Sequence, residues 1–215
     1  MGSFALEALA RTGIGSFVLV DFDTIDVTNI NRQIYALHTT IGEKKAKVAK
    51  QRIKDINPDA HVKIQDSFVN AESIENLLSQ DIDIVIDAID GLNSKVNLIC
   101  KAKEMGLKVV SSMGAAGKTD ASMIKISDLF DTTICPLARF VRQRLRRRGI
   151  VENIQCVYSE EPPKNNINES FLEAESEYDP EQDHGRKRPS LGTVPHVTGT
   201  FGLMIANIVI SEILN

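Results

Sequence analysis

The chain has 215 residues, of which 42% are hydrophobic and 25% are charged. This is ordinary globular composition, and it excludes collagen-like, wholly disordered and disulfide-framework proteins. The formal net charge is −4, but residues 160–183 contain nine acidic residues and one lysine, so the remainder of the chain carries +4. The length allows one large domain or two small ones.

Hydrophobic periodicity predicts alternating helices and strands. Residues 4–11 have helical spacing and end at Gly13, and apolar runs predict strands at 17–21, 61–64, 82–87 and 107–111. Helical segments at 43–56, 71–79 and 92–105 separate these strands. The alternation predicts an α/β fold with a doubly wound, mostly parallel, Rossmann-like sheet whose ligands bind outside the carboxyl ends of the strands.

The pattern after residue 120 predicts a C-terminal α/β extension. We divide the single expected domain into a nucleotide-binding core (1–127), a basic helix and strand (128–159), an acidic mobile loop (160–190) and a C-terminal apolar helix (191–215). An acidic stretch with few apolar residues buries too little surface to offset its ordering entropy. The apolar helix is at the length threshold for a membrane span, but its polar residues favour a core or interfacial helix, with peripheral membrane contact possible.

Two glycine-containing segments resemble phosphate-binding loops incompletely. A doubly wound nucleotide domain begins with a strand and a glycine-rich turn, whereas this chain opens on the following helix, so we expect the first strand to be missing from this sequence. Gly13 and Gly15 do not supply the turn, because the third glycine would fall at Val18, within a strand. Residues 112–119 end like a P-loop, but Ser112 replaces the first glycine and a strand is predicted next.

The most informative stretch is residues 21–33, DFDTIDVTNINRQ. Asp21 ends a predicted strand, where an acidic side chain can accept hydrogen bonds from a ribose hydroxyl, and Asp23 follows it. Thr28, Asn29 and Arg32 lie on a polar turn, where a guanidinium can bind phosphate oxygens through two hydrogen bonds.

A lysine and two aspartates extend this pattern. Lys45 begins a predicted helix, where its positive charge adds to the anion preference of a helix N-terminus. Asp87 and Asp90, in DAIDG at the end of another strand, could hold magnesium together with phosphates. Each of these residues alone is more often a solvated surface residue. Together, on adjacent strand ends, they predict a triphosphate site.

The chain resembles a known family in several of these motifs. DFDTIDVTNINRQ, GEKKAKV, INPDAHV and DAIDGLNSK are similar to the ThiF-type fold of ubiquitin-activating enzymes and sulfur-carrier adenylyltransferases. VVSSMGAAGK, PLARFVRQRLRRRGI, CVYSEE and the final GTxxxVTGTFGLMIA resemble the branch of tRNA threonylcarbamoyladenosine dehydratases. The likeness runs from Gly2 nearly to Asn215 and is interrupted by the acidic loop.

The resemblance implies ATP and magnesium as cofactors, tRNA as a partner, and a homodimer. It implies that Asp21 is the ribose partner, that Lys45 neutralises phosphate charge and that Asp90 is the magnesium-side carboxylate. The residues that it places around the phosphates are Thr28, Asn29, Asn31 and Arg32. Gly2 and Ser3 match the end of the family's glycine loop, and Cys135 replaces the usual aspartate before a proline.

Six arginines between residues 139 and 148 form a basic helix, with Val141 and Leu145 facing inward. A solvated helix face is the simpler interpretation. The positive charge of the chain outside the acidic loop favours tRNA binding, which would fall steeply with salt. The arginines expected to contact tRNA are Arg139, Arg142, Arg146 and Arg147.

The implied reaction forms an acyl-adenylate on the threonyl carboxylate, and the carbamoyl group of the same nucleoside then displaces AMP. An intramolecular nucleophile already has a large effective concentration, so no enzyme cysteine is required. Cys100, Cys135 and Cys156 form no CxxC pair, which argues against zinc. The alternatives are an activator of a ubiquitin-like or sulfur-carrier protein, a catalytically silent tRNA-binding relative and, last, a nicotinamide oxidoreductase. The family implies a cytoplasmic location or, in eukaryotes, the mitochondrial outer membrane.

Overall fold

The computed structural model describes residues 1–67, 69, 73–78, 81–162 and 192–214. Its helices are α1 (Gly2–Arg11), α2 (Lys45–Ile56), α3 (Ser73–Leu78), α4 (Leu92–Glu104), α5 (Pro136–Arg147) and α7 (Pro195–Leu214). Its strands are β1 (Ser16–Val20), β2 (His61–Gln65), β3 (Ile84–Asp87), β4 (Lys108–Ser112), β5 (Ile124–Asp128) and β6 (Gln155–Ser159). Each predicted helix and strand is found within a few residues of its expected bounds; the acidic loop, apart from residues 160–162, lies outside the described residues.

The strands form two sheets instead of the single expected one. β1 pairs with β2 in parallel, and the second sheet has the order β3-β4-β6-β5, with only β5 antiparallel to its neighbour. In the doubly wound order 3-2-1-4-5, the place between β1 and β3 belongs to the strand that precedes the first helix. No described strand occupies that place, which explains why β1 and β3 are not joined in one sheet.

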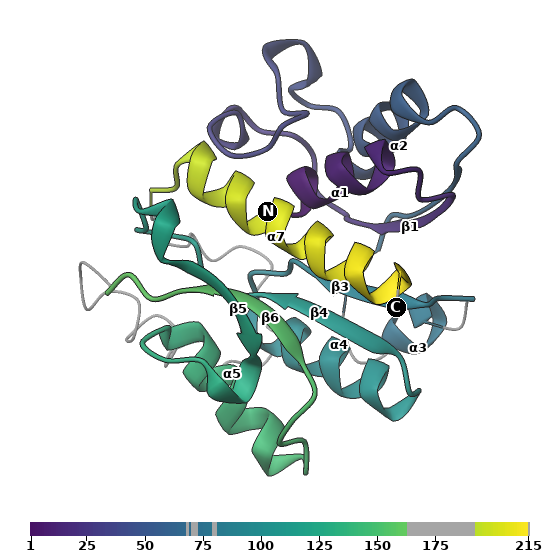
Figure 1. The fold of residues 1–215 in the computed structure, drawn as a ribbon. Helices are drawn as coiled ribbons and strands as arrows, with labels where there is room; N and C mark the ends of the chain where they lie inside the picture. The colour runs from purple at the N-terminus through teal and green to yellow at the C-terminus, as the bar shows by residue number, and fades with distance from the viewer. Residues whose placement is uncertain (68, 70–72, 79–80, 163–191, 215) are drawn as a thin grey trace, which may run out of the picture.

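Helices cover both faces of the four-stranded sheet, α4 and α5 on one side and α1 and α7 on the other (Figure 1). Side-chain alternation along β4 and β6 separates two layers of core. Val109 and Cys156 point to the face covered by α4 and α5, whereas the next residues, Val110 and Val157, point to the face covered by α1 and α7. Successive side chains of a strand point to opposite faces, so the four-stranded sheet is buried on both sides. A third cluster packs α2 against β2 through Ile53 and Val62.

Helix α7 lies directly against α1 and has the composition of a core helix. A Cβ added to Gly202 would lie 2.5 Å from the backbone oxygen of Met1, so only glycine allows the helices to approach this closely. The helix is long and apolar enough to cross a membrane by length and composition, but half of its most apolar window is buried inside the structure. Its buried face includes Val197, Phe201 and Ile205.

Candidate nucleotide site

The first turn of α1 lies over the carboxyl ends of β3 and β4. A Cβ on Gly2 would lie 3.4 Å from the Cβ of Ala88, which follows β3, and the Ser112 hydroxyl at the end of β4 is 2.8 Å from the Met1 sulfur. Burial, and then the charge of Arg32, lower the pKa of the Met1 amino group to about 6. Arg32 therefore lies near the N-terminal end of α1, where backbone N–H groups favour anions.

Asp21 follows β1 and is partly enclosed. Burial raises the pKa of its carboxyl above the usual value, and the nearby charges of Asp23 and Asp90 act in the same direction. The backbone N–H of Asp23 donates to Asp21 Oδ1 at 3.0 Å, and the charge of Lys45 opposes the rise. Asp90, which follows β3, is close enough to act on the Asp21 carboxyl, which follows β1.

Lys45 is the first residue of α2, and its ammonium lies 2.6 Å from Asp23 Oδ2. The backbone N–H of Lys45 also donates to the Asp23 carbonyl oxygen at 3.0 Å, so the helix start and the loop after β1 are fixed together. The lysine side chain is 11% exposed and the Asp23 side chain 47%. The Lys45 ammonium is therefore already held in place by a carboxylate when a phosphate approaches from solvent.

The turn that carries Arg32 is built by two side-chain caps. Asp26 accepts a hydrogen bond from the Thr28 N–H, while the side-chain oxygen of Asn29 accepts one from the Asp26 N–H. Asn29 is buried and shapes the turn, and its predicted contact with phosphate stays a prediction. Arg32 is partly buried, and its guanidinium donates to the carbonyl oxygen of Thr28 and to the side-chain oxygen of Asn31.

Asn31 connects this turn to a distant part of the chain. Its side-chain nitrogen donates to the carbonyl oxygen of Thr193 at 2.9 Å, and the Thr198 hydroxyl donates to the carbonyl oxygen of Arg32 at 3.5 Å. The start of α7 therefore supports the loop that presents the guanidinium. The sequence analysis missed Thr193 and Thr198, since their contacts join residues more than 160 positions apart and leave no local pattern.

Asp87 does not occupy the exposed position expected of a direct magnesium ligand. Its side chain is fully buried and forms an ion pair of 2.6 Å with Lys95, which is also fully buried. Asp90, three residues later, is exposed. The prediction is therefore corrected for Asp87: a carboxylate enclosed on all sides contacts the protein instead of a ligand. The clue to Lys95 in the sequence was a charged residue in the apolar stripe of α4, between Leu92 and Ile99.

The residues that ended like a P-loop form a different structure. Gly117 has a φ of +72°, and the backbone continues through a short 3-10 turn into β5 instead of a helix. Lys118 is buried and donates to the carbonyl oxygen of Glu161. The Glu161 carboxylate in turn accepts from the N–H groups of Thr119 and Asp120. No local sequence pattern indicates this role of Glu161.

The arginines of α5 divide into two groups. Arg142 is partly buried and donates to the carbonyl oxygen of Thr132 at 2.9 Å, and burial lowers its pKa. Arg144 and Arg148 donate to the side-chain oxygens of two α4 residues, Asn93 and Asn97. The fully exposed members include three of the four selected for tRNA: Arg139, Arg146 and Arg147. The selection of Arg142 is therefore corrected, because its guanidinium anchors α5 to the preceding turn.

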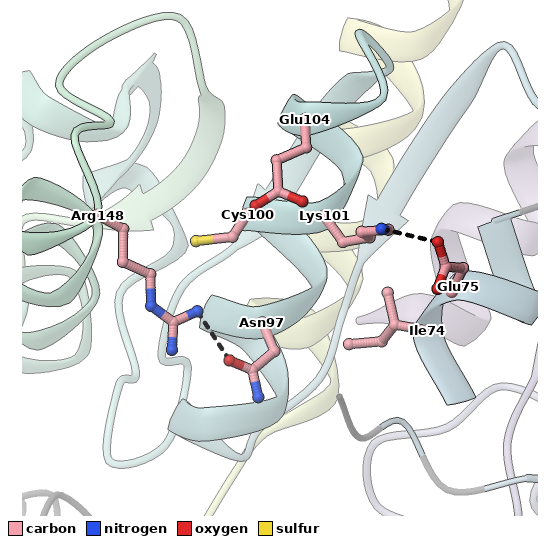
Figure 2. Close-up of a pocket in the computed structure, with 7 residues that line it drawn as sticks. All are labelled: Ile74, Glu75, Asn97, Cys100, Lys101, Glu104 and Arg148. Atoms are coloured by element: carbon pink, nitrogen blue, oxygen red, sulfur yellow. Dashed lines mark hydrogen bonds and ion pairs between the residues drawn. The ribbon is translucent and has the colours of Figure 1, made fainter. Parts of the chain in front are cut away.

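A separate hollow of about 180 Å³ lies between α3, α4 and the end of α5 (Figure 2). Three of its charged residues already have partners: Lys101 contacts Glu75 at 3.1 Å, and Arg148 donates to Asn97 at 2.8 Å. Lys101 and Cys100 lie towards the C-terminal end of α4, opposite the end that follows Asp90. The hollow is therefore distinct from the nucleotide site.

The geometry agrees with the family suggested by the sequence motifs. A model of the ThiF family matches residues 1–215. The chain belongs to the ThiF family. This ThiF-family chain is 42% identical over 163 residues to the tRNA threonylcarbamoyladenosine dehydratase of Bacillus subtilis (strain 168), a match that covers 76% of the chain and 64% of that protein. It is 37% identical over 214 residues to the enzyme of the same name from Escherichia coli (strain K12), covering 95% of the chain and 79% of the relative.

A solved structure supports the same placement of this ThiF-family chain. The crystal structure of the Escherichia coli tRNA N6-threonylcarbamoyladenosine dehydratase in complex with ATP superposes with a TM-score of 0.83 at 33% identity. The match covers 100% of this chain and 82% of that one. The predicted α/β fold and the resemblance to the dehydratase branch are both confirmed.

Proposed function

We propose that this chain uses ATP to dehydrate N6-threonylcarbamoyladenosine in tRNA to its cyclic form. The observation that carries the proposal is a group of charges after the strand ends: Lys45 and Asp90 lie close enough to Asp21 to act on its carboxyl, and Arg32 acts on the Met1 amino group at the start of α1. The similarity to dehydratases over 79% of the Escherichia coli protein supports the same activity.

The chemistry follows from where these charges lie. The threonyl carboxylate attacks the α-phosphorus of ATP, pyrophosphate leaves, and an acyl-adenylate forms. The carbamoyl group of the same nucleoside then attacks the acyl carbon and releases AMP, so that the net change in the nucleoside is loss of one water. Arg32 and Lys45 supply fixed positive charge where negative charge grows on the phosphates, and this preorganisation is a large source of catalysis.

Asp90 fits a magnesium ion held jointly with phosphates. In the described part of the chain, no three His, Cys, Asp or Glu side chains are placed to hold a metal by themselves. Magnesium bound to nucleotides needs only one or two carboxylates, since phosphates and waters complete its shell. The exposed Asp90 and the half-exposed Asp23 are the carboxylates that would hold it, and when bound it would neutralise charge on the triphosphate.

The exposed arginines of α5 supply the surface proposed for tRNA. Arg139, Arg146 and Arg147 are solvent-exposed, and the residues between them on the inward face, Val141 and Leu145, are fully buried. This separation fixes the helix in one orientation, with its cations outward. Phosphate neutralisation by such a face carries most of the affinity in nucleic-acid binding.

The decisive experiment is conversion of threonylcarbamoyladenosine-containing tRNA with and without ATP, read by mass spectrometry of the released nucleosides. We expect ATP-dependent loss of one water and release of AMP. Release of pyrophosphate that requires a protein ending in Gly-Gly, and not tRNA, would assign the chain to the protein-activating alternative. Binding of tRNA without any ATP turnover would make it a silent relative.

The cysteines provide a second test of the same proposal. All three are free and buried, and burial raises the pKa of Cys156 far above its usual value, so none is presented as an acceptor for a thioester. The Cys135→Ala and Cys156→Ala variants should therefore retain dehydration. Loss of activity in a variant with an unchanged melting temperature would establish a thioester step instead.

We also propose that the chain forms a homodimer and that α7 can contact a membrane peripherally, and each proposal has its own test. Exposed apolar side chains occur in the loop after β1, at Phe22, Leu37 and Ile41, and support burial against a second copy. Light scattering during size-exclusion chromatography should give twice the chain mass of 23.7 kDa. Flotation with liposomes tests contact through Leu203 and Leu214 of α7, which are exposed. Cytoplasmic or mitochondrial location stays a prediction.

A further inference from the structure

Lys95 is among the largest fully buried side chains in the described structure, and its ammonium has three protein acceptors. It donates to Asp87 Oδ2 at 2.6 Å, to the carbonyl oxygen of Ser112 at 2.9 Å and to the Ser111 hydroxyl at 3.4 Å. An ammonium carries three donors. Lys95 therefore uses all of them to join α4 to the ends of β3 and β4.

Both oxygens of the Asp87 carboxylate also accept hydrogen bonds. Besides Lys95, its Oδ2 atom accepts from the Ser111 hydroxyl at 2.5 Å, and its Oδ1 atom accepts from the backbone N–H of Ile89 at 3.1 Å. Asp87 and Ser111 are opposite each other in the register of β3 and β4. The Ile89 contact is the one that leaves the sheet and reaches into the turn after β3.

The other side of the turn is held by the backbone of the first turn of α4, independently of the Lys95 side chain. The backbone N–H of Lys95 donates to the carbonyl oxygen of Gly91 at 3.0 Å as α4 begins. Asp90 is exposed between Ile89, which is held by Asp87, and Gly91, which is held by the helix of Lys95. The turn is therefore fastened on both sides of the exposed carboxylate.

Stability alone does not explain such a pair. Burying two charges carries a desolvation penalty that can exceed their attraction, and well-packed apolar residues often serve as well or better. A buried pair whose carboxylate holds the backbone next to the exposed Asp90 is instead suited to orienting that side chain. Groups that fix the direction of a metal ligand affect metal affinity even though they do not touch the metal.

We propose that Lys95 is a positioning residue that, through Asp87, sets the direction of Asp90 towards a divalent cation bound with the nucleotide. The inference rests on the proposed function, because it assumes that Asp90 faces a cation–nucleotide complex. It concerns a different property of the site: the Lys95–Asp87 pair is predicted to affect binding of the cation and not the contacts to adenine, ribose or phosphate.

The test uses Mn²⁺ as a paramagnetic probe with the full chain. The double variant Asp87→Asn/Lys95→Met removes both buried charges together, which avoids leaving one unpaired. We expect it to bind Mn²⁺ in the presence of ATP roughly 10- to 100-fold more weakly than the unmodified chain, measured by electron paramagnetic resonance. Its affinity for ATP without divalent cation should be unchanged, because Asp21, Arg32 and Lys45 are untouched.

Lys101→Met is the matched control. Lys101 lies on the same helix and pairs with Glu75, but its side chain is 30% exposed and is near the opposite end of α4. It should leave Mn²⁺ binding unchanged. If the double variant does not fold, Ser111→Ala is the second variant: it removes one hydrogen bond from Asp87 Oδ2 and should weaken Mn²⁺ binding in the same direction.

Two results would overturn the inference. A folded double variant with the Mn²⁺ affinity of the unmodified chain would reduce Lys95 to a packing role, and so would an unchanged affinity in Ser111→Ala where only that variant folds. Equal losses of Mn²⁺ binding and of cation-free ATP binding would also reject it, because the pair would then support the whole site. If the unmodified chain binds no ATP, the proposed function fails, which is a distinguishable outcome.

Discussion

The ammonium of Lys45 lies 2.6 Å from the carboxylate of Asp23, and one backbone hydrogen bond joins the same two residues. The lysine is nearly enclosed while its partner is half-exposed. The pair therefore places a positive charge at the rim of the site and holds it there before a nucleotide binds. Preorganisation of this kind avoids reorientation during the reaction.

Two variants separate the charge of Lys45 from its structural contact. Both Lys45→Met and Asp23→Asn break the same ion pair, but only Lys45→Met removes the cation. We expect Lys45→Met to lower kcat/KM for ATP by about 100- to 1,000-fold, as loss of a preorganised donor does, and Asp23→Asn to lower it less. Steady-state pyrophosphate release measures both. Because Asp23 is also a proposed magnesium carboxylate, ATP binding without divalent cation is measured beside turnover; equal losses of that binding would mean that the pair acts only by holding the loop.

Arg32→Ala should abolish ATP-dependent turnover and leave the melting temperature nearly unchanged. The side chain is partly buried, but its guanidinium donates hydrogen bonds within its own turn, to Thr28 and Asn31, so its removal should cost little stability. Arg32→Lys is the control that keeps the charge but loses the planar, two-pronged donor geometry, and it should recover only part of the activity. Full turnover in Arg32→Ala would remove this residue from the mechanism.

Replacing Arg139, Arg146 and Arg147 together by glutamine should flatten the salt dependence of tRNA binding. Each lost phosphate contact reduces the slope of log affinity against log salt by about 0.7 to 0.9, so three lost contacts give a reduction of about two. Fluorescence anisotropy at several salt concentrations measures it.

The matched control replaces Arg144 and Arg148, which donate to Asn93 and Asn97 of α4. We expect this variant to lower the melting temperature while keeping the slope. An unchanged slope in the triple variant would mean that the arginine face of α5 is only solvated and does not bind tRNA. Arg142→Gln should destabilise the chain by about 1 to 3 kcal/mol, because it removes a charged donor from the carbonyl oxygen of Thr132.

Asp21 should make ATP binding weaken at acidic pH. Burial raises its folded-state pKa above the usual value for an aspartate, so protonation begins at a higher pH than for an exposed aspartate and removes the charged acceptor for the ribose hydroxyl. Titration calorimetry at a series of acidic pH values measures the loss of ATP affinity. In Asp21→Asn, the ATP affinity should no longer change with pH in this way. An affinity that stays constant as pH falls through the raised pKa would exclude Asp21 as the ribose partner.

The same shift predicts a stability effect of opposite sign. A raised folded-state pKa means that the folded chain favours the neutral form, so this contribution to stability is present at low pH and is lost as pH rises through the folded-state pKa. At neutral pH, Asp21→Asn should therefore raise the melting temperature of the nucleotide-free chain while weakening ATP binding. Equal melting temperatures for both chains across the pH range would contradict this.

Gly202→Ala should strongly destabilise the chain. The added methyl carbon would lie 2.5 Å from the Met1 carbonyl oxygen and 2.8 Å from the Ala5 nitrogen, and a backbone cannot yield as a side chain can. The α1–α7 contact would open, at a cost of about 1 to 3 kcal/mol as for overpacking in general.

Gly199→Ala, one turn earlier, is the control for helix propensity. Its new methyl group would meet only the Phe4 ring at 3.4 Å, and alanine favours a helix over glycine by about 1 kcal/mol. It should be neutral or stabilising in urea denaturation. If both variants behave alike, close approach of the helices is not what requires Gly202.

Local sequence determined the elements and the strand-end residues of this protein. The period of apolar residues sets which segments are helices or strands, and it is a property of neighbours along the chain. It correctly placed β1 before Asp21, β3 before Asp90, and Val141 and Leu145 on the inward face of α5. The family resemblance also followed from short contiguous motifs.

Only the tertiary structure decided which polar groups face solvent. Asp87 and Asp90 lie three residues apart in one motif, yet one is enclosed with Lys95 and the other is exposed. Arg142 and Arg146 share a basic helix, yet one holds the turn at Thr132 and the other stays outward. The fate of a polar side chain depends on the surfaces that pack around it, and residues distant in sequence supply those surfaces, so no local pattern encodes it.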